Sequence, residues 1–343
     1  MSRRVTLKEV AALAGVSYQT VSKVLNQQIQ VSKETERRIF QAVDSLGYRP
    51  NQLARSMRSQ RSHLIGYSWA PTPPDQVNPI LDQFLQSMAQ AAESAGYHLL
   101  AFPYHKGEQW VDAYRDLVDT KRVDGFVLSS VEFDDPRIRF LQERDFPFVA
   151  FGRSNPGWDF PFVDVDGGAG MRMVAGHLAA LGCRHIAVLA WPEGSRVGQN
   201  RLEGLLSGLE EARIPAEQVR VSRGEGNYQF GLECSRSWLE LPQTQRPDAI
   251  VAFNDMMATG AMQAAREKGL QVGRDLAVTG FDDVPMVQYL SPPLTSVRQP
   301  IWEVGLQVMS NLLKLLDGIP LDGARLLLQP RLVVRESSGG RMA

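Results

Sequence analysis

The sequence predicts an α/β protein in which a helix-turn-helix domain precedes a two-lobed domain built on doubly wound parallel sheets. Two observations carry this prediction. The first 50 residues contain three short amphipathic helical segments, and from residue 63 onward apolar, β-rich runs alternate with helical stretches. Repeated βα units with continuous apolar strands are typical of parallel sheets covered by helices on both faces. The second part, about 280 residues long, is large enough for two such lobes.

Composition limits the class of protein. The 343 residues are 43% hydrophobic and 22% charged, as in ordinary globular proteins. Cys183 and Cys234 are the two cysteines and form no paired motif, so we expect no disulfide scaffold, no zinc finger and a reducing cytosol. The sequence has no apolar run of membrane-spanning length and no signal-peptide pattern at its start. We therefore expect a cytoplasmic protein that does not associate with membranes.

Charge is distributed unevenly along the chain. Residues 1–63 hold eleven Lys and Arg against four acids, a net charge of +7, whereas the remainder carries −8. A basic segment joined to a mildly acidic body indicates a polyanionic partner at the N-terminal end. Charge alone is equally compatible with an uneven solvated surface.

Capping residues delimit the three N-terminal helices. Thr6 followed by Glu9 forms a capping box at the start of the first helix, and Gly15 allows the sharp turn that ends it. Ser17 is placed to cap the second helix and Ser32 the third. Two helices joined by a tight glycine turn, with a third packed across them, define a helix-turn-helix.

The second of these helices carries side chains that suit DNA. A recognition helix within VSYQTVSKVLN (16–26) would offer its N-terminal turn to the major groove. There Tyr18 and Gln19 can bond base edges, and Lys23 suits guanine. The residues expected to bond phosphates are Thr6, Ser17, Ser22 and Asn26. The alternative is a polar face of a protein-interaction module, but capping, spacing and the basic flank together favour DNA.

A basic segment, residues 50–62, connects the two parts. PNQLARSMRSQRS has no acid and three arginines, and it predicts one short helix over 51–57 followed by a polar linker. Because a helix of this length is unstable alone, we expect it to fold only against a partner. The predicted domains are a headpiece at 1–49, this hinge segment, and a two-lobed domain at 63–343.

The strand and helix pattern of the larger domain predicts its division into lobes. Strand-like runs lie at 64–69, 98–102, 125–129, 147–151, 161–165, 185–190, 248–253 and 276–281, with a further strand-like segment at 326–337. Helical stretches lie near 80–95, 110–121, 169–181, 200–212, 255–268 and 301–317. The expected lobes are about 63–161 with 296–324, and 162–295 with 325–343.

Several segments resemble a known family. Residues 5–57, beginning VTLKEVAALAGVSYQTVSKVLN, resemble the DNA-binding headpiece of the lactose-repressor (LacI/GalR) family. Downstream, LIGYS, HLAALGCRHIAVLA, RLEGL, AFNDMMATGAM and VTGFDD resemble the ligand-binding domain of that family, which is periplasmic-binding-protein-like. The resemblance runs nearly end to end. It implies a homodimeric transcription factor whose hinge helices open the minor groove at the centre of a pseudo-palindromic operator.

The resemblance also implies DNA contacts for the hinge segment. It places Asn51, Ala54 and Met57 against the DNA, with Met57 at the position of a leucine that wedges into the central base step. Methionine is apolar and flexible enough to act as such a wedge. The alternative for Met57 is packing against the headpiece.

An effector site is expected where strands of the two lobes end, because ligands bind there in doubly wound folds. Asn254 follows one strand and Asp282 another, and Arg201 is taken as the start of a helix. By resemblance these three residues match effector-contacting positions. Carboxylate, amide and guanidinium groups suit a hydroxyl-rich ligand. The alternative for Asp282 and its neighbour Asp283 is a helix cap or loop anchor.

Such a ligand also needs apolar surface against its C–H groups. By resemblance Tyr228 matches an aromatic that packs on the effector; Trp69 is a second candidate platform, and Gln299 is a further possible contact between lobes. The weaker aromatic candidates are Trp110, Trp158 and Trp191. The alternative for each lone tryptophan is core packing.

Motifs of catalysis and metal binding are missing from the sequence. Neither GxxxxGK[ST] nor GxSxG occurs, and the glycines of FVDVDGGAGMR (162–172) do not match GxGxxG. His177 and His185 have no partner at ligand spacing. We therefore expect no catalytic residue, no metal and no cofactor.

The sequence therefore predicts a DNA-binding transcriptional regulator, a repressor, whose operator affinity is switched by a small sugar-type effector bound between two lobes. A purine- or nucleoside-type corepressor is the alternative effector. A free sugar-binding protein of an import system is the alternative class, which the headpiece and the missing signal peptide disfavour.

Overall fold

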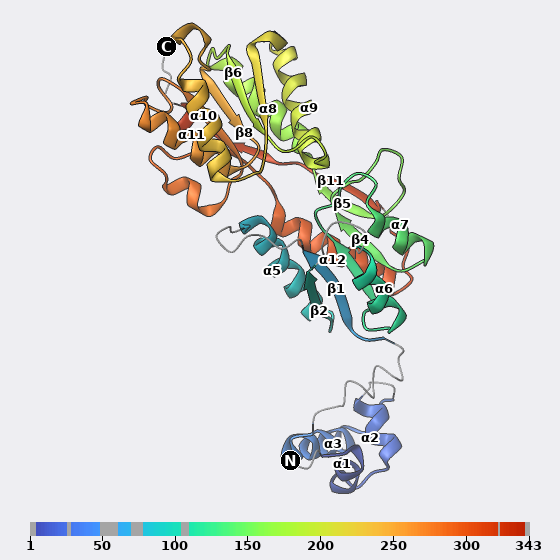
Figure 1. Cartoon of the computed structure of the whole chain (residues 1–343). Coiled ribbons are helices and arrows are strands. Elements are labelled where there is room, and N and C mark those ends of the chain that lie inside the picture. Colours follow the sequence, from blue (N-terminus) through green and yellow to red (C-terminus); the bar gives the residue numbers. More distant parts are fainter. Residues whose placement is uncertain are drawn as a thin grey trace. The chain divides into compact units, whose positions relative to one another are not determined.

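The structure is a computed structural model that describes residues 5–25, 29–48, 61–69, 78–103, 110–321 and 323–339. By its internal contacts the chain divides into two units, residues 1–62 and residues 63–343 (Figure 1). Each unit has a hydrophobic core of its own.

The first unit is a three-helix domain made of α1 (Leu7–Ala14), α2 (Tyr18–Leu25) and α3 (Lys33–Leu46). At α1, Thr6 N donates to Glu9 Oε2 over 2.7 Å and Glu9 N donates to Thr6 Oγ1 over 3.4 Å, which confirms the capping box. Gly15 ends this helix at φ 63°, in the left-handed region that favours glycine. Val21 and Ile39 are fully buried in the core. The predicted helix-turn-helix is confirmed.

The first lobe of the second unit is built on a six-stranded parallel sheet in the order β11–β5–β4–β3–β1–β2. Its strands are β1 (Leu64–Trp69), β2 (His98–Pro103), β3 (Gly125–Leu128), β4 (Phe148–Phe151), β5 (Phe162–Val165) and β11 (Arg325–Leu328). Its helices are α5 (Pro79–Ser94), α6 (Asp112–Asp119), α7 (Pro136–Glu143) and α12 (Ile301–Leu316). Successive residues of a strand face opposite sides of the sheet. On one face Val127 packs in a core with α5 and α12, and on the other face Phe126 packs in a core with α6 and α7.

The second lobe has a six-stranded sheet in the order β12–β10–β9–β8–β6–β7, parallel except between β10 and β12. Its strands are β6 (Ile186–Ala190), β7 (Val219–Arg223), β8 (Ala249–Ala252), β9 (Ala277–Asp282), β10 (Thr295–Arg298) and β12 (Arg331–Val333). Its helices are α8 (Gly167–Ala180), α9 (Arg196–Glu211), α10 (Tyr228–Leu239), α11 (Asp255–Glu267) and α13 (Glu336–Gly339), with short 3-10 helices at Ala216–Gln218, Gln243–Gln245 and Pro285–Tyr289. Helix α8 packs on α9 and α10 on α11 (Figure 1).

The chain passes from one lobe to the other three times. Each passage comes after a strand, β5, β10 or β11, that was expected to lie in the next lobe. Strand β5 still pairs in the first sheet, β10 in the second, and β11 in the first again. The expected boundaries at about 162, 296 and 325 were therefore wrong. An apolar strand looks the same in either sheet, so the crossing could not be placed before or after it from sequence.

Two strands, three α-helices and the short 3-10 helices of the described residues escaped prediction; the shortest α-helix, α13, begins inside the segment 326–337 that was expected to be strand-like. Strand β7 is an edge strand whose side chains are mostly exposed, so it lacks an apolar run, and β10 is built on threonine and serine. Helices α7 and α10 are rich in polar residues. Helix α9 begins at Arg196, after the cap Ser195, so the expectation that Arg201 starts this helix was wrong. No helix in the described part of the chain is both long and apolar enough to span a membrane.

Candidate functional site

The N-terminal turn of α2 presents polar side chains to solvent. Ser17, Gln19 and Lys23 are exposed, and Tyr18 is 43% exposed. Ser17 Oγ also accepts the Thr20 N–H over 3.1 Å, which fixes the first turn of the helix. This face offers an aromatic hydroxyl, an amide and an ammonium group close together on one short helix, a combination that can read base edges.

The other residues expected at DNA divide into three cases. Thr6 is exposed but its hydroxyl donates to Glu9 Oε2 over 2.9 Å. Ser22 is only 7% exposed, so it does not share the solvent-facing surface of α2 with Gln19 and Lys23. The residues that lie outside the described part of the chain are Asn26, Asn51, Ala54 and Met57, together with the expected hinge helix.

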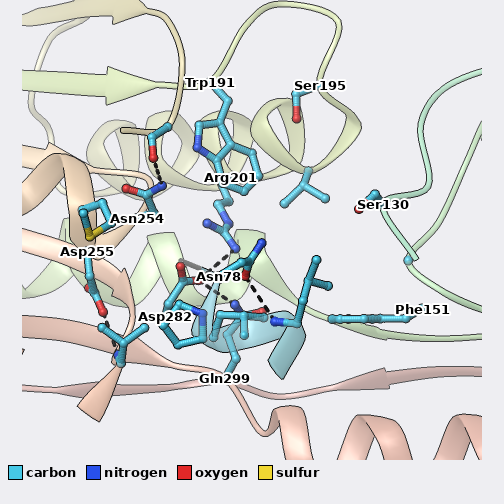
Figure 2. Close-up of a pocket in the computed structure, with 18 of the residues that line it drawn as sticks. Asn78, Ser130, Phe151, Trp191, Ser195, Arg201, Asn254, Asp255, Asp282 and Gln299 are labelled. Carbon is cyan, nitrogen blue, oxygen red and sulfur yellow. Dashed lines mark hydrogen bonds and ion pairs between the residues drawn. The ribbon is translucent and has the colours of Figure 1, made fainter. Parts of the chain in front are cut away.

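A cavity of about 380 Å³ lies between the two lobes of the second unit (Figure 2). The first lobe contributes the N-terminal turn of α5 and the ends of β3, β4 and β5; the second contributes the N-terminal turns of α9 and α11 and the end of β9. These are carboxyl ends of parallel strands and the helix starts that follow them, the usual ligand position in doubly wound sheets. The volume is at the lower end of the range for small-molecule sites.

Arg201 lies in the second turn of α9 and is 3% exposed. Its guanidinium carbon lies 4.8 Å from the ring centre of Trp191, which Figure 2 shows beside it, and 3.6 Å from the ring centre of Phe281, so two aromatic rings contact the cation. Nη1 donates to the carbonyl oxygen of Phe253, and Nη2 lies 3.7 Å from Asp282 Oδ1. Burial lowers the pKa of Arg201, and the nearby Asp282 carboxylate opposes that change.

Asp282 and Asp283 have different environments. Asp282 ends β9 at φ 111° and lines the cavity; its Oδ1 accepts from Gln299 Nε2 over 2.7 Å. No described residue bonds its Oδ2. Burial raises the pKa of Asp282 to about 6, although Arg201 and Gln299 act in the opposite direction. Asp283 instead pairs with Arg298 and with Arg335, whose Nη1 lies 2.7 Å from Asp283 Oδ1, so it anchors the loop.

The wall beside Asp282 is organised by the start of α11. Asn254 caps this helix: Oδ1 accepts from Met257 N over 2.9 Å, and Nδ2 donates to Gly226 O over 2.7 Å. Asp255 accepts from Ser296 Oγ over 2.6 Å, and its other oxygen accepts a backbone N–H over 2.8 Å. Burial and the neighbouring Asp282 raise the pKa of Asp255 well above its usual value. Both side chains therefore shape the cavity with their hydrogen bonds already satisfied.

The cavity brings together four of the six residues expected to contact an effector: Arg201, Asn254, Asp282 and Gln299. Tyr228 and Trp69 are not among its lining residues. Tyr228 begins α10 and packs on the core of the second lobe, and Trp69 packs on the core of the first. The aromatic lining comes from Trp191 and Phe151 instead.

Of the three weaker aromatic candidates, Trp191 lines the cavity, directly after β6, whereas Trp110 and Trp158 are not among its lining residues. Sequence reasoning missed Phe151, the last residue of β4, and Asp164, near the end of β5. The strand-end rule that selected Asn254 would have found both had it been applied to every strand. Acidic groups predominate over basic ones: the charged lining residues are Glu132, Asp164, Asp255, Asp282 and Arg201. Within the described residues, no cluster of His, Cys, Asp or Glu is suited to hold a metal ion.

Two family models match the chain. Bacterial regulatory proteins, lacI family, matches residues 6–51, and Periplasmic binding protein-like domain matches residues 175–338. The chain is 32% identical over 340 residues to the HTH-type transcriptional regulator CelR of Thermobifida fusca, covering 98% of each chain. It is 31% identical over 334 residues to the HTH-type transcriptional repressor PurR of Photorhabdus laumondii, covering 97% of this chain and 96% of that one.

Three solved structures of LacI-family regulators also resemble the chain. A LacI-family regulatory protein from Chloroflexus aggregans is 51% identical, with a TM-score of 0.76, covering 81% of this chain and 99% of that one. The Lac repressor dimer bound to operator and the anti-inducer ONPF is 29% identical, with a TM-score of 0.85 and 98% and 99% covered. A CelR–cellobiose complex is 30% identical, with a TM-score of 0.73 and 97% and 100% covered. The chain belongs to the LacI family of bacterial regulatory proteins.

Proposed function

We propose that this regulator is a repressor whose operator affinity is switched by a small sugar bound in the interlobe cavity. The observation that carries the proposal is the composition of the cavity wall. The carboxylates of Asp282 and Asp164 share one cavity with the aromatic rings of Trp191 and Phe151. Sugars present hydroxyl groups around a ring whose faces are apolar, and such ligands need hydrogen-bond acceptors beside flat hydrocarbon surface.

Each group has a defined role in the proposed complex. Asp282 Oδ2, which no described residue bonds, accepts a sugar hydroxyl. Trp191 packs on a C–H face of the ring, held in place by Arg201 behind it at 4.8 Å. Gly226 lets its backbone pack closely against Trp191, because a Cβ at this position would lie 2.6 Å from Trp191 Nε1. The similar structure of CelR was solved as a complex with cellobiose, which supports a sugar.

On the DNA side, we propose that Tyr18, Gln19 and Lys23 read bases in the major groove, and that the protein binds a pseudo-palindromic operator as a homodimer in the cytoplasm. Exposure of these three side chains on one helix supports the first part. The Lac repressor was solved as a dimer on its operator, which supports the second. Light scattering of the purified protein, alone and with operator, tests the stoichiometry.

A nucleoside or purine is the second candidate effector. Trp191 and Phe151 can stack on a nucleobase as well as on a sugar, and the relatives include proteins named PurR and CytR. The raised pKa of Asp282 also allows a protonated carboxyl to donate to a ring nitrogen.

Thermal-shift measurements with cellobiose, ribose, cytidine and hypoxanthine separate the two effector classes. Operator fragments selected from genomic DNA then report the effect of each binder by fluorescence anisotropy. We expect a sugar to raise the melting temperature and to change operator affinity at the same concentrations. If only cytidine or hypoxanthine raises the melting temperature, the proposed sugar effector is wrong and the nucleoside or purine is supported.

A further inference from the structure

The N-terminus of α9, in the second lobe, lies against two loops of the first lobe. These loops follow β3 and β4 and are tied to one another. Ser154 Oγ donates to Glu132 O over 2.7 Å, and Asn155 Oδ1 accepts from Asp134 N over 2.7 Å. Ser154 is 2% exposed. Hydrogen bonds therefore hold these two loops, residues 132–134 and 154–155, together beside the cavity.

Arg196, the first residue of α9, contacts these two loops in three ways. Its backbone N–H donates to Glu132 Oε2 over 3.1 Å, and its side-chain Nε donates to Ser154 O over 3.0 Å. Its guanidinium carbon lies 5.4 Å from the ring centre of Phe133. One residue of the second lobe is therefore bonded to both loops of the first.

The backbone bond has a particular physical meaning. The first N–H groups of a helix have no acceptor within the helix. Ser195 Oγ satisfies the Gly198 N–H over 3.1 Å from within the same lobe, but the Arg196 N–H is satisfied from the other lobe. The negative charge of Glu132 also lies at the positive end of the α9 dipole. Separating the lobes would expose the Arg196 amide to solvent and break the hydrogen bond from the Arg196 guanidinium to Ser154 O.

A second contact lies one turn further along α9. Arg153 of the first lobe pairs with Asp164 over 2.7 Å and donates to Asn200 Oδ1 over 3.4 Å. Asn200 Oδ1 also accepts the Gly168 N–H at the start of α8, over 3.1 Å. The face of α9 formed by Arg196 and Asn200 is therefore the part of the helix that bonds the first lobe.

We propose that Arg196 is a positioning residue that fastens the two lobes around the effector. Glu132 bonds the Arg196 amide and also lines the cavity, so one carboxylate belongs to both the fastening contact and the ligand wall. An effector that touches both lobes binds the fastened form. The fraction of molecules in that form then scales the apparent effector affinity. The link to the effector rests on the function proposed above, whereas the fastening itself does not.

Hydrogen exchange on the ligand-free, full-length protein tests the fastening. Glu132→Ala should speed exchange at the Arg196 amide at least tenfold and leave the Gly198 amide, capped by Ser195, unchanged. Arg196→Ala should increase the radius of gyration measured by X-ray scattering, and Arg196→Lys should restore part of the wild-type value. The matched control is Arg236→Ala, which removes an ion pair with Glu267 within the second lobe. Exchange at the Arg196 amide that does not change in Glu132→Ala, or scattering that does not change in Arg196→Ala, would overturn the proposal. Glu132→Leu and Arg196→Met, which keep the size of the side chain and remove its hydrogen-bonding group, replace an alanine variant that does not fold.

Calorimetry with cellobiose and with cytidine then tests the link to the effector. For whichever probe binds the wild type, Arg196→Ala should weaken binding about tenfold and Arg236→Ala should not. Wild-type protein that binds cytidine but not cellobiose contradicts the proposed sugar and not the fastening. Unchanged affinity in Arg196→Ala contradicts the coupling even when a sugar binds.

Discussion

Arg201 and Asp282 meet at the wall of the interlobe cavity, with Nη2 3.7 Å from Oδ1 and side chains only 4% and 16% exposed. Burial acts against both charges, lowering the pKa of Arg201 and raising that of Asp282, while their mutual attraction opposes each change. Removing one member of such a pair leaves the other uncompensated. A substitution of either residue should therefore change both the stability of this wall and the binding of a ligand to it.

The first prediction concerns Asp282→Asn. The change keeps the shape of the side chain but removes the charge that faces Arg201 and the acceptor offered to a hydroxyl. Losing a buried charged partner should cut effector affinity on the order of tenfold to a hundredfold. Ligand-free operator binding should persist, because the headpiece is a separate unit. Calorimetry and operator anisotropy on the same preparation measure both quantities.

The neighbouring carboxylate provides the control. Asp283 pairs with Arg298 and Arg335 and anchors its loop, so Asp283→Asn should lower the melting temperature. If Asp282→Asn lost operator binding together with effector binding, Asp282 would have the same structural role as Asp283.

The second prediction concerns the pH dependence of stability. The folded-state pKa of Asp282 is about 6 against an ordinary value of 3.8, so between these values the native protein binds more protons than the unfolded chain. The contribution of Asp282 to stability should therefore fall as pH rises through this window. Asp282→Asn should flatten the decline in melting temperature between pH 4 and pH 7 without abolishing it, because the raised pKa of Asp255 acts in the same direction. A decline identical to that of the wild type would show that Asp282 titrates normally.

The third prediction concerns the aromatic wall. Trp191 lines the cavity and covers Arg201, so Trp191→Ala should weaken effector binding about threefold to tenfold, and Trp191→Phe should keep most of it. Effector binding should also change the tryptophan fluorescence of the wild type. Trp158 stacks on Arg139 at 4.9 Å and does not line the cavity, so Trp158→Phe is the matched control. A fluorescence change retained in Trp191→Phe but lost in Trp158→Phe would place the ligand elsewhere.

Local chemistry made much of the fold predictable. The capping box of Thr6 and Glu9 marks the start of α1 within four residues of sequence, and the buried strands are apolar runs that need no knowledge of their neighbours. The edge strand β7 and the polar helix α10 lack such a signature, because tertiary packing stabilises them rather than their own residues. The lobe crossings depend on which sheet a strand joins, which is a long-range property.

The candidate site shows the same division. The family resemblance selected Asp282 and Arg201, which do line the cavity, whereas the strand-end rule by itself could not tell Asp282 from Asp283. Two adjacent aspartates at φ 111° and 52° project differently, and only the backbone determines which one lines the cavity. Tyr228 was misplaced for a similar reason, since the start of α10 packs it on the core while Trp191 lines the wall.

The last prediction concerns base readout by α2. Gln19 is exposed in the first turn of the helix, where a glutamine amide can make two hydrogen bonds to adenine. Gln19→Ala should therefore cost about 1–3 kcal/mol at one position of each half-site and relax the preference there, while leaving other positions unchanged. Anisotropy titrations against single-base variants of a selected operator measure this. The slope of log affinity against log salt should stay the same in Gln19→Ala, because a neutral side chain releases no counterion. Lys23→Ala should reduce the slope, because an ammonium group held against the DNA displaces a counterion. Equal weakening of all operator variants by Gln19→Ala would mean that Gln19 supports the helix or the backbone contact and does not read sequence.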